Sequence, residues 1–359
     1  MDIRLSRRLT DLPFSREQWN ALAGETPGAT LFQTYEWFEC WWGAFGAGKE
    51  LFCATIWDKG NLLGIVPLMR FRRSGIRHLE IVGSPNGDYQ DFILGNRSAT
   101  LLPEIARFLH AERDQWDMLV LRNLPTESPT HQFLPALVRE FGLHATDLER
   151  IACPTVQIAS RPEDTRRMLD RYSIRRRIKA MRQHGEIAFR RITTRQELDT
   201  YLPDFFEQYV ERRRGSPAAQ TFLRADVRDF YRRLSEAMLA AGWLHFSVLE
   251  LGGRPAAYHL GFEYGRRLYW YKPSFDPTLR SLSPGLVLLN FLIRDAAERH
   301  LDELDFTVGV EAFKYRYSNA ERTNANLRVF TSGAHYSVFA AVARIRRALS
   351  RLRRAARLG

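Results

Sequence analysis

A loop that contains serine and glycine and precedes an apolar helix is the segment of this sequence best suited to chemistry. It holds Arg280, Ser281, Ser283 and Gly285, and the helix is expected to begin at Pro284. A serine at the N-cap accepts a backbone hydrogen bond, and proline in the first helical turn has no amide hydrogen to leave unpaired. The free amides of such a helix start, beside Arg280, are suited to binding a pyrophosphate. A plain helix cap without a ligand is the alternative, and the loop alone does not decide between the two.

Two further segments allow both a binding and a structural interpretation. Residues Thr165–Gln183 predict one helix rich in arginine, a residue type that binds phosphates, so a polyanionic acceptor such as tRNA or a nucleotide-linked sugar is one hypothesis. Its regularly spaced apolar residues instead favour an amphipathic helix that faces solvent. The aromatic segment Phe32–Trp42 predicts a helix whose rings either stack on sugars or fill a core, and its place in the first half suggests packing between two domains.

The C-terminal tail, residues 336–359, alternates apolar residues with arginine. As a helix it would be basic and amphipathic, which is typical of segments that lie on anionic membranes or bind an acidic partner. A solvated extension without a partner is the alternative.

Composition narrows the class of protein. The chain has 359 residues, of which 45% are hydrophobic and 26% charged, and a formal net charge of +12. Such a length suits two globular domains, and the positive charge attracts anions without selecting one. The three cysteines are scattered, so neither a metal site nor a disulfide framework is expected. Without a signal peptide or an apolar run of membrane-spanning length, the sequence predicts a cytoplasmic protein, with peripheral attachment to the inner membrane as a hypothesis for the tail.

The elements that must position the loop alternate between strands and helices, which predicts an α/β fold with a mixed sheet. In the first half, the pattern predicts a hairpin with arms at Leu51–Trp57 and Leu62–Phe71 and a turn at Asp58–Asn61. It also predicts a strand at Tyr89–Leu94. In the second half, a long hairpin is followed by a strand at Arg267–Lys272, the helix from Pro284, and a strand at Glu303–Val308. The hairpins of the two halves share an apolar pattern, which favours two tandem domains, residues 1–160 and 161–335, and a tail.

The stretch from Leu268 to Tyr317 resembles the GNAT-type domain of CelD-like proteins, a group associated with polysaccharide production and related to the FemAB peptidyltransferases. The resemblance rests on LYWYKPSFDP, SLSPGLVLL and a closing DF-x-x-G-x-E-x-x-K-Y pattern that begins at Asp305. It extends more weakly over Tyr172–Phe330 and to FQTYEW and GSPNGDYQDF in the first half. The loop lacks the Gln/Arg-x-x-Gly-x-Gly/Ala signature of ordinary GNAT acetyltransferases. The resemblance implies two tandem GNAT-like domains, with the acyltransferase in the second.

What the resemblance implies for the site is a pair of parting strands, here Arg267–Lys272 and Glu303–Val308, with an acyl-CoA donor between them. A backbone N–H near Tyr269 would bind the thioester carbonyl, and the loop up to Leu286 would bind the phosphates. The protein would act by holding donor and acceptor together and by stabilising the oxyanion.

An attacking amine must lose a proton and the departing thiolate must gain one. On the resemblance, Glu311 or Glu263 is the expected base, with His259 and Asp305 as further candidates, and Tyr271 or Tyr315 is the expected acid. Lys314 would stabilise negative charge on the carbonyl or hold a phosphate. The alternatives are structural: Glu311 and Lys314 could simply pair with each other, Asp305 could cap the end of its strand, and His259 fits a core histidine better.

The leading hypothesis is therefore an N- or O-acyltransferase that moves an acyl group from acetyl-CoA or a longer acyl-CoA to an amine or hydroxyl of a polysaccharide or cell-envelope precursor, without a metal. A FemAB-like transfer of an amino acid from aminoacyl-tRNA is the second. The third is a non-catalytic accessory protein of polysaccharide synthesis that binds a saccharide or a synthase.

Overall fold

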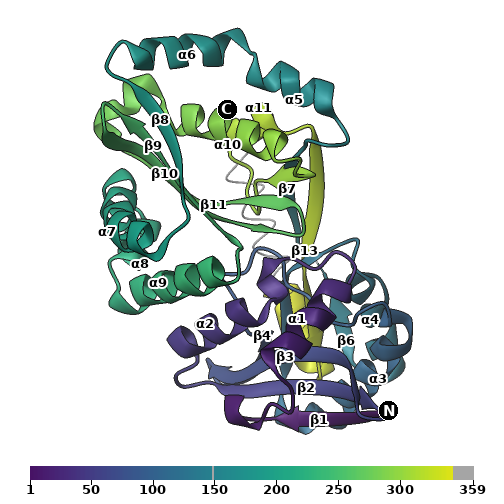
Figure 1. Cartoon of the computed structure of the whole chain (residues 1–359). Coiled ribbons are helices and arrows are strands. Elements are labelled where there is room, and N and C mark those ends of the chain that lie inside the picture. Colours follow the sequence, from purple (N-terminus) through teal and green to yellow (C-terminus); the bar gives the residue numbers. More distant parts are fainter. Residues whose placement is uncertain (148, 343–359) are drawn as a thin grey trace. The chain divides into compact units, whose positions relative to one another are not determined.

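The computed structural model of the chain describes residues 1–147 and 149–342, and these form two compact units (Figure 1). Unit 1 contains Met1–Ala29, Gly48–Arg150 and the chain from Ala325, and unit 2 contains Thr30–Ala47 and Ile151–Asn324. The expected segments 1–160 and 161–335 differ from these units, because residues 30–47 cluster with unit 2 and residues after 324 with unit 1. Each unit is thus built from separated stretches of sequence.

Unit 1 is a mixed sheet with helices. Its strands have the order β1–β2–β3–β4–β5–β13, and β6 also pairs with β13. The elements are β1 (Asp2–Ser6), η1 (Leu9–Asp11), α1 (Arg16–Glu25), β2 (Glu50–Asp58), β3 (Asn61–Arg73), β4 (Ile76–Ile81), α3 (Ser98–Ala111), η3 (Arg113–Gln115), β5 (Met118–Pro125), α4 (Pro129–Glu140), β6 (His144–Thr146) and the end of β13 (Ala320–Phe330).

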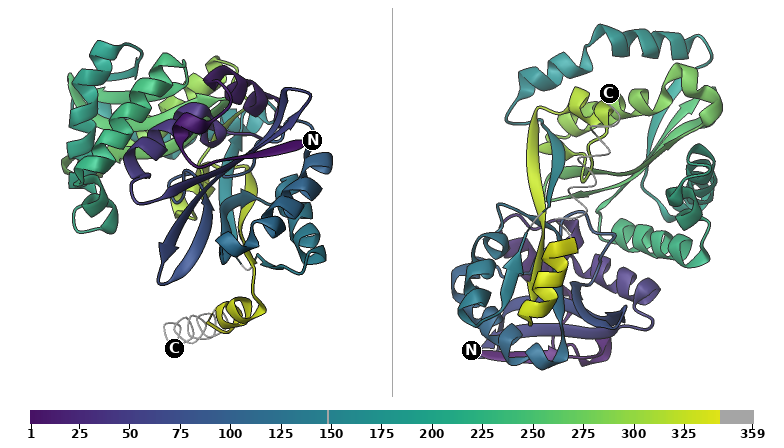
Figure 2. Two further views of the ribbon diagram at one scale, coloured as in Figure 1. Left: turned by 90° about the horizontal axis from the view of Figure 1, so that it is seen from below. Right: turned by 180° about the vertical axis from the view of Figure 1, so that it is seen from behind.

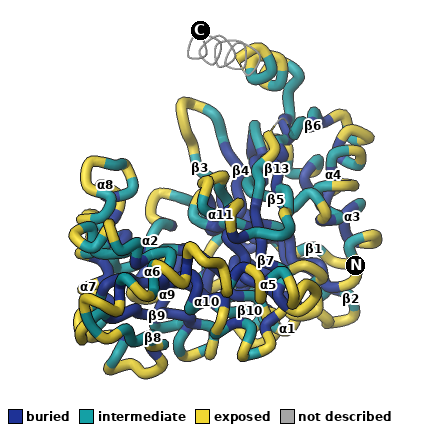
Figure 3. Tube along the Cα trace, turned by 90° about the horizontal axis from the view of Figure 1, so that it is seen from above, coloured by how far each residue is buried: buried dark blue, intermediate teal, exposed yellow. Residues whose placement is uncertain are grey.

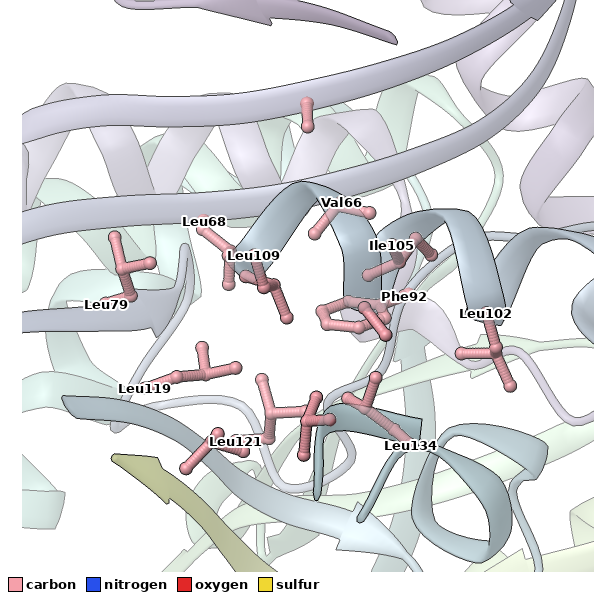
Figure 4. Packing of buried hydrophobic residues seen from close by; sticks show 14 of the residues in the cluster. Val66, Leu68, Leu79, Phe92, Leu102, Ile105, Leu109, Leu119, Leu121 and Leu134 are labelled. Atoms are coloured by element: carbon pink, nitrogen blue, oxygen red, sulfur yellow. The ribbon is translucent and has the colours of Figure 1, made fainter. Parts of the chain in front are cut away.

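The predicted hairpin of unit 1 is confirmed as β2 and β3. Lys59 and Gly60 both have positive φ values, 48° and 84°, which is the turn geometry that matches the twist of the two strands. Figure 4 shows the core beside it, where leucine side chains of β3, β4, β5 and α3 meet around Phe92. The predicted strand Tyr89–Leu94 is wrong: only Ile93 forms a bridge, with Ile65. The amide of Gln90 instead donates to the carbonyl of Asn123.

Unit 2 is also α/β, so the expected fold class is confirmed for both units. Its strands have the order β7–β12–β11–β10–β9–β8. The elements are η2 (Leu31–Gln33), α2 (Tyr35–Phe45), β7 (Arg150–Gln157), α5 (Pro162–Leu169), α6 (Tyr172–Arg182), β8 (Ile187–Ile192), α7 (Arg195–Arg212), α8 (Pro217–Phe222), α9 (Ala225–Ala240), β9 (Leu244–Leu251), β10 (Arg254–Tyr264), β11 (Arg267–Phe275), η4 (Pro277–Leu282), α10 (Pro284–Glu298), β12 (Glu303–Asp305), α11 (Ala312–Tyr317) and the start of β13.

Helices cover both faces of the unit 2 sheet (Figure 1). Two consecutive residues of β9 contact helices on different faces of the sheet. His245 Nε2 lies 3.2 Å from Asp295 Oδ2 of α10, whereas the ring of Phe246 contacts that of Phe205 on α7. Because successive strand residues point to opposite faces, α10 and α7 pack on opposite sides. Figure 3 shows β9 and β10 mostly in the colour of buried residues.

The aromatic helix α2 belongs to unit 2. The ring of Trp37 contacts those of Phe230 on α9 and Tyr271 on β11, with centroids 5.8 Å and 6.0 Å apart. Trp37 and Trp41 are 0% and 2% exposed. Their rings are buried among residues of this unit and have no face left for a sugar.

The predicted helix Thr165–Gln183 is two helices, α5 and α6, which Figure 2 shows meeting at a bend. Both pack against α10. The buried side chain of Asn290 on α10 donates to the carbonyl of Leu169 at 3.2 Å, which satisfies a backbone acceptor left open at the end of α5. This bond joins the end of α5 to α10.

In the described part of the chain, no helix is both long and apolar enough to cross a bilayer. Residues 333–342 of the chain are helical. The rest of the tail predicted to lie on membranes, residues 343–359, is outside the described residues.

Candidate functional site

Strands β11 and β12 of unit 2 run parallel and part after three residue pairs. The pairs are Arg267 with Glu303, Leu268 with Leu304, and Tyr269 with Asp305. β11 continues to Phe275 and stays paired with β10. Within the residues that the structure describes, no strand pairs with its other edge beyond Tyr269. The expected parting of two neighbouring strands is thus present.

The strands part because the chain after β12 follows β7 instead of β11. The amides of Phe306 and Gly309 donate to the carbonyls of Pro154 and Ala152 at 3.0 Å and 3.2 Å. Asp305 accepts the amide of Thr307 at 2.7 Å, and Thr307 has a φ of 56°. The strand expected at Glu303–Val308 therefore ends at Asp305, whose carboxylate caps the turn.

β11 bulges where the parting begins. Leu260 pairs with Lys272 and Phe262 with Tyr269, so Trp270 and Tyr271 both lie opposite Gly261. A bulge of this kind bends the strand and leaves a backbone group without its ladder partner. The residues near Tyr269 at which we expect an oxyanion donor are therefore the ones whose pairing is interrupted.

The loop before α10 has the predicted helix start with a different cap. α10 begins at Pro284, and the carbonyl of Ser283 accepts the amides of Leu286 and Val287. Ser283 itself has φ 56° and ψ 50°, and its side chain makes no cap hydrogen bond. The expectation of a side-chain cap is wrong, because this left-handed backbone turns the hydroxyl away from the first helical amides. Proline has no amide hydrogen, so Gly285 supplies the first amide of α10.

The other predicted members of the loop lie around this helix start. Arg280 and Ser281 are exposed, and a Cβ atom on Gly285 would lie 3.3 Å from the ring of Phe275. Leu286 is partly buried beside the core of unit 2. The residues that we expect to bind the acyl donor's phosphates therefore lie together in the segment that follows β11.

Glu311 and Lys314 meet at the start of α11. The ammonium Nζ of Lys314 lies 3.0 Å from Glu311 Oε2 and donates to the carbonyl of Val308 at 2.9 Å. Lys314 is 3% exposed, whereas the Glu311 side chain is 58% exposed. A Cβ atom on Gly309, which has a φ of 136°, would overlap Glu311 and lie 2.7 Å from Lys314 Nζ. Only glycine fits this turn, a role that the sequence analysis did not assign to Gly309.

Glu263 lies elsewhere in unit 2. Its carboxylate forms an ion pair with Arg299 at 2.6 Å, and Arg299 is the C-cap residue of α10. α10 has 15 residues, so about 22 Å of helix separates this pair from the loop at the N-terminus. The structure therefore does not bring Glu263 to the predicted phosphate loop.

The two predicted tyrosines differ in surroundings. Tyr271 is buried among the rings of Phe32, Trp37 and Phe262, with its hydroxyl 3.5 Å from that of Tyr231. Tyr315, on α11, is 47% exposed. Only Tyr315 has a side chain open to solvent.

Aromatic rings border the parting on the face covered by α10. The ring of Trp270 lies 6.3 Å from that of Phe306 and 6.4 Å from that of Phe313, measured between centroids. Since Phe313 lies between Glu311 and Lys314 in the chain, this packing places the start of α11 against β11 at its bulge. The sequence analysis gave Phe306 and Phe313 no role, although apolar residues between charged ones at a helix start are a signal of packing.

Comparison with known families assigns the segment that contains this site. Residues 168–315 match the sequence profile of a family described as acetyltransferase (GNAT) domain. The matched residues lie within unit 2 and are similar to a GNAT-type domain. The match includes the parting strands, the loop before α10 and the Glu311–Lys314 pair, and it supports acyl transfer as the general chemistry. A search of curated protein sequences gives no match to this chain.

Solved structures show the same fold along nearly the whole chain. FemX has 11% sequence identity and a TM-score of 0.64, with 94% of this chain and 99% of FemX covered. The C-terminal domain of a putative lysylphosphatidylglycerol synthetase from Agrobacterium fabrum has 13% identity and a TM-score of 0.55, with 92% and 95% covered. L-PGS from Bacillus licheniformis has 11% identity and a TM-score of 0.53, with 90% and 94% covered. At these identities the likeness concerns the fold and leaves the substrates open.

The described residues contain no group of three or more His, Cys, Asp or Glu side chains arranged to hold a metal ion.

Proposed function

We propose that this protein transfers an acyl group from an acyl-CoA to an amine or hydroxyl group of a saccharide in polysaccharide or cell-envelope synthesis. The observation that supports acyl transfer most is the parting of β11 from β12 after Tyr269, at the bulge of β11. An interrupted ladder provides backbone donors for a thioester carbonyl, and oriented donors of this kind stabilise the developing oxyanion.

Within this proposal, Glu311 accepts the proton of the attacking group. Its side chain is exposed, and one carboxylate oxygen is held by Lys314, which leaves the other free to meet the acceptor. Glu263 is unsuited to this role because Arg299 holds its carboxylate at the far end of α10. Buried Lys314 positions Glu311, and its charge lies close enough to the turn to favour a negative carbonyl oxygen as well.

Tyr315 is the proposed acid for the leaving thiolate. It follows Lys314 directly and its side chain is exposed. Its hydroxyl hydrogen-bonds to Glu321, a contact that it would exchange for one to the sulfur. The hydroxyl of Tyr271 is enclosed by aromatic rings. General acid and base catalysis by such groups contributes about 10²- to 10⁴-fold each.

The experiment that tests the proposal is an assay of CoA release from acetyl-CoA and longer acyl-CoAs with amino sugars and oligosaccharides as acceptors. We expect acceptor-dependent release by the natural chain and a loss of about 100-fold in Glu311→Gln with unchanged acyl-CoA binding. Glu298→Gln, at an exposed residue near the other end of α10, is the matched control. Absence of binding and release with every acyl-CoA would contradict the proposal.

Transfer from aminoacyl-tRNA is the second candidate, favoured by the cationic helix α6 and by the fold shared with FemX. It predicts binding of charged tRNA and no binding of acyl-CoA. Saccharide binding without either donor would indicate the accessory role instead.

A further inference from the structure

A cavity of about 400 Å³ lies between helix α6 and the loop that leads into α10. It is separate from the parting of the strands but shares the predicted phosphate loop. Its lining residues are Tyr172, Ser173, Arg176, Arg177, Ala180, Ser281, Leu282 and Ser283. The α6 residues recur at spacings of three and four, so one face of this helix forms a wall of the cavity.

The α6 wall is positively charged, and helix α6 itself contains no acidic residue. No Asp or Glu occurs between Asp170 and Glu186. Among the described residues, Arg176 and Arg177 form no ion pair, although Arg167 of the preceding helix pairs with Asp164 at 2.7 Å. Unpaired guanidinium groups beside a helix N-terminus favour a phosphorylated ligand.

Tyr172 adds an aromatic surface at the rim. It is 74% exposed. An exposed aromatic ring next to cations can stack on a nucleobase, and such stacking is worth about 1–3 kcal/mol in nucleic-acid complexes.

A larger cavity of about 630 Å³ lies at the other end of α10, lined in part by Arg166, Arg266 and His300. Two of its arginines are already neutralised, because Arg166 pairs with Glu163 and Arg266 with Asp302. It therefore offers less free positive charge than the cavity at α6.

We infer that the cavity between α6 and the Ser281–Ser283 loop binds the adenosine 3′,5′-bisphosphate part of CoA. Arg176 and Arg177 contact its phosphates, and Tyr172 stacks on the adenine. The inference rests on the proposed function, since it assumes an acyl-CoA donor. From Trp270 to Phe275, β11 covers roughly 17 Å, a length that the extended pantetheine arm can follow from the bulge to this loop. A cavity of this volume suits one nucleotide, whereas tRNA would need a broad surface.

Calorimetric titration of the full chain with acetyl-CoA and with 3′-dephospho-acetyl-CoA tests the inference. The natural chain should bind acetyl-CoA about tenfold more tightly than the dephospho compound, which equals about 1.4 kcal/mol. The double variant Arg176→Gln/Arg177→Gln should lose this preference and about tenfold in affinity for acetyl-CoA. Tyr172→Ala should weaken both ligands alike, by about fivefold.

The matched control is Arg175→Gln/Lys179→Gln, which removes the same charge from the same helix at exposed residues outside the cavity lining. Its affinities should stay within about twofold of the natural chain, because exposed charges that do not contact the ligand are screened by solvent. Equal losses in both double variants would overturn the inference in favour of general attraction by the helix.

Acetyl-CoA binding without a preference for the 3′-phosphate, or unaffected by Arg176→Gln/Arg177→Gln, would overturn the inference and leave the proposed function standing. No binding of acetyl-CoA by the natural chain would overturn both. In that case, a fall in charged-tRNA binding in the same variant would assign α6 to the tRNA hypothesis.

Discussion

The imidazole Nε2 of His259 lies 3.2 Å from the carbonyl oxygen of Tyr269, across the pair formed by β10 and β11. Burial holds the pKa of His259 well below its ordinary value, so the neutral ring donates this hydrogen bond through Nε2. The ring also stacks on Trp270, with centroids 5.0 Å apart. His259 therefore fixes the bulge of β11 from the core, and a structural role explains it better than catalysis does.

Gly261 is the residue that makes room for this hydrogen bond. A Cβ atom on Gly261 would overlap the imidazole and lie 2.5 Å from the carbonyl oxygen of Tyr269, which is backbone and cannot rotate away. We expect Gly261→Ala to lower the free energy of unfolding by about 3 kcal/mol in urea denaturation. In the control Gly43→Ala, a helical glycine with no atom near the new Cβ, stability should rise by up to about 1 kcal/mol. Equal stabilities of the two variants would refute the account of the bulge.

Gly309→Ala should disrupt the Glu311–Lys314 pair although both of these residues are retained. The new Cβ would occupy the position of the Glu311 carboxylate, and a φ of 136° is strained for alanine. We expect acyl transfer to fall by about as much as in Glu311→Gln, with acyl-CoA binding retained. Full activity in this variant would show that the pair is not needed for transfer.

Tyr315→Phe should lower kcat by about 10- to 100-fold and remove the alkaline limb of the pH–rate profile, because the proposed acid is lost. Its stability should be unchanged, since the side chain is 47% exposed. Tyr271→Phe is the matched variant, and it should keep both kcat and the pH profile. A reversed result would assign the acid to Tyr271.

Asp91 predicts a pH dependence of stability in unit 1. Burial raises the pKa of Asp91 to about 6, although Ser128 and the amide of Phe92 donate hydrogen bonds to it. In the unfolded chain the group titrates near pH 3.9, so the folded state binds the proton more tightly and stability falls as pH rises from about 4 to about 6. The loss should be roughly 2–3 kcal/mol, measured by urea unfolding across this range. Asp91→Asn should abolish this pH dependence, whereas Asp114→Asn, at an exposed residue, should retain it. If the two variants showed the same dependence of stability on pH, the raised pKa of Asp91 would be contradicted.

Local signals predicted most of the elements near the site. The start of α10 follows from Ser-Pro-Gly, whose proline suits the first turn of a helix, and the hairpins follow from their glycine turns. The parting of β11 and β12 was expected from the family resemblance. Its physical cause is the hydrogen bonding of the chain after Asp305 to the backbone of β7, which the sequence did not predict.

Long-range contacts explain what the sequence did not predict. The end of α5 is hydrogen-bonded to Asn290, which lies 121 positions further along the chain than Leu169. The place of α2 depends on Phe230 and Tyr271, and the isolation of Glu263 depends on Arg299. Helical periodicity and charge spacing describe single segments, so they carry no information on such partners.

The membership of α2 in unit 2 has a practical consequence for dissecting the protein. A recombinant fragment of residues 161–335 would leave out both α2 and β7. Phe230 and Tyr271 would then be exposed by the loss of Trp37. The chain after Asp305 would lose its hydrogen bonds to the backbone of β7. Such a fragment should be aggregation-prone and inactive even if every proposed catalytic residue is retained. The inactivity of this fragment would therefore not show that residues of the first half take part in the reaction.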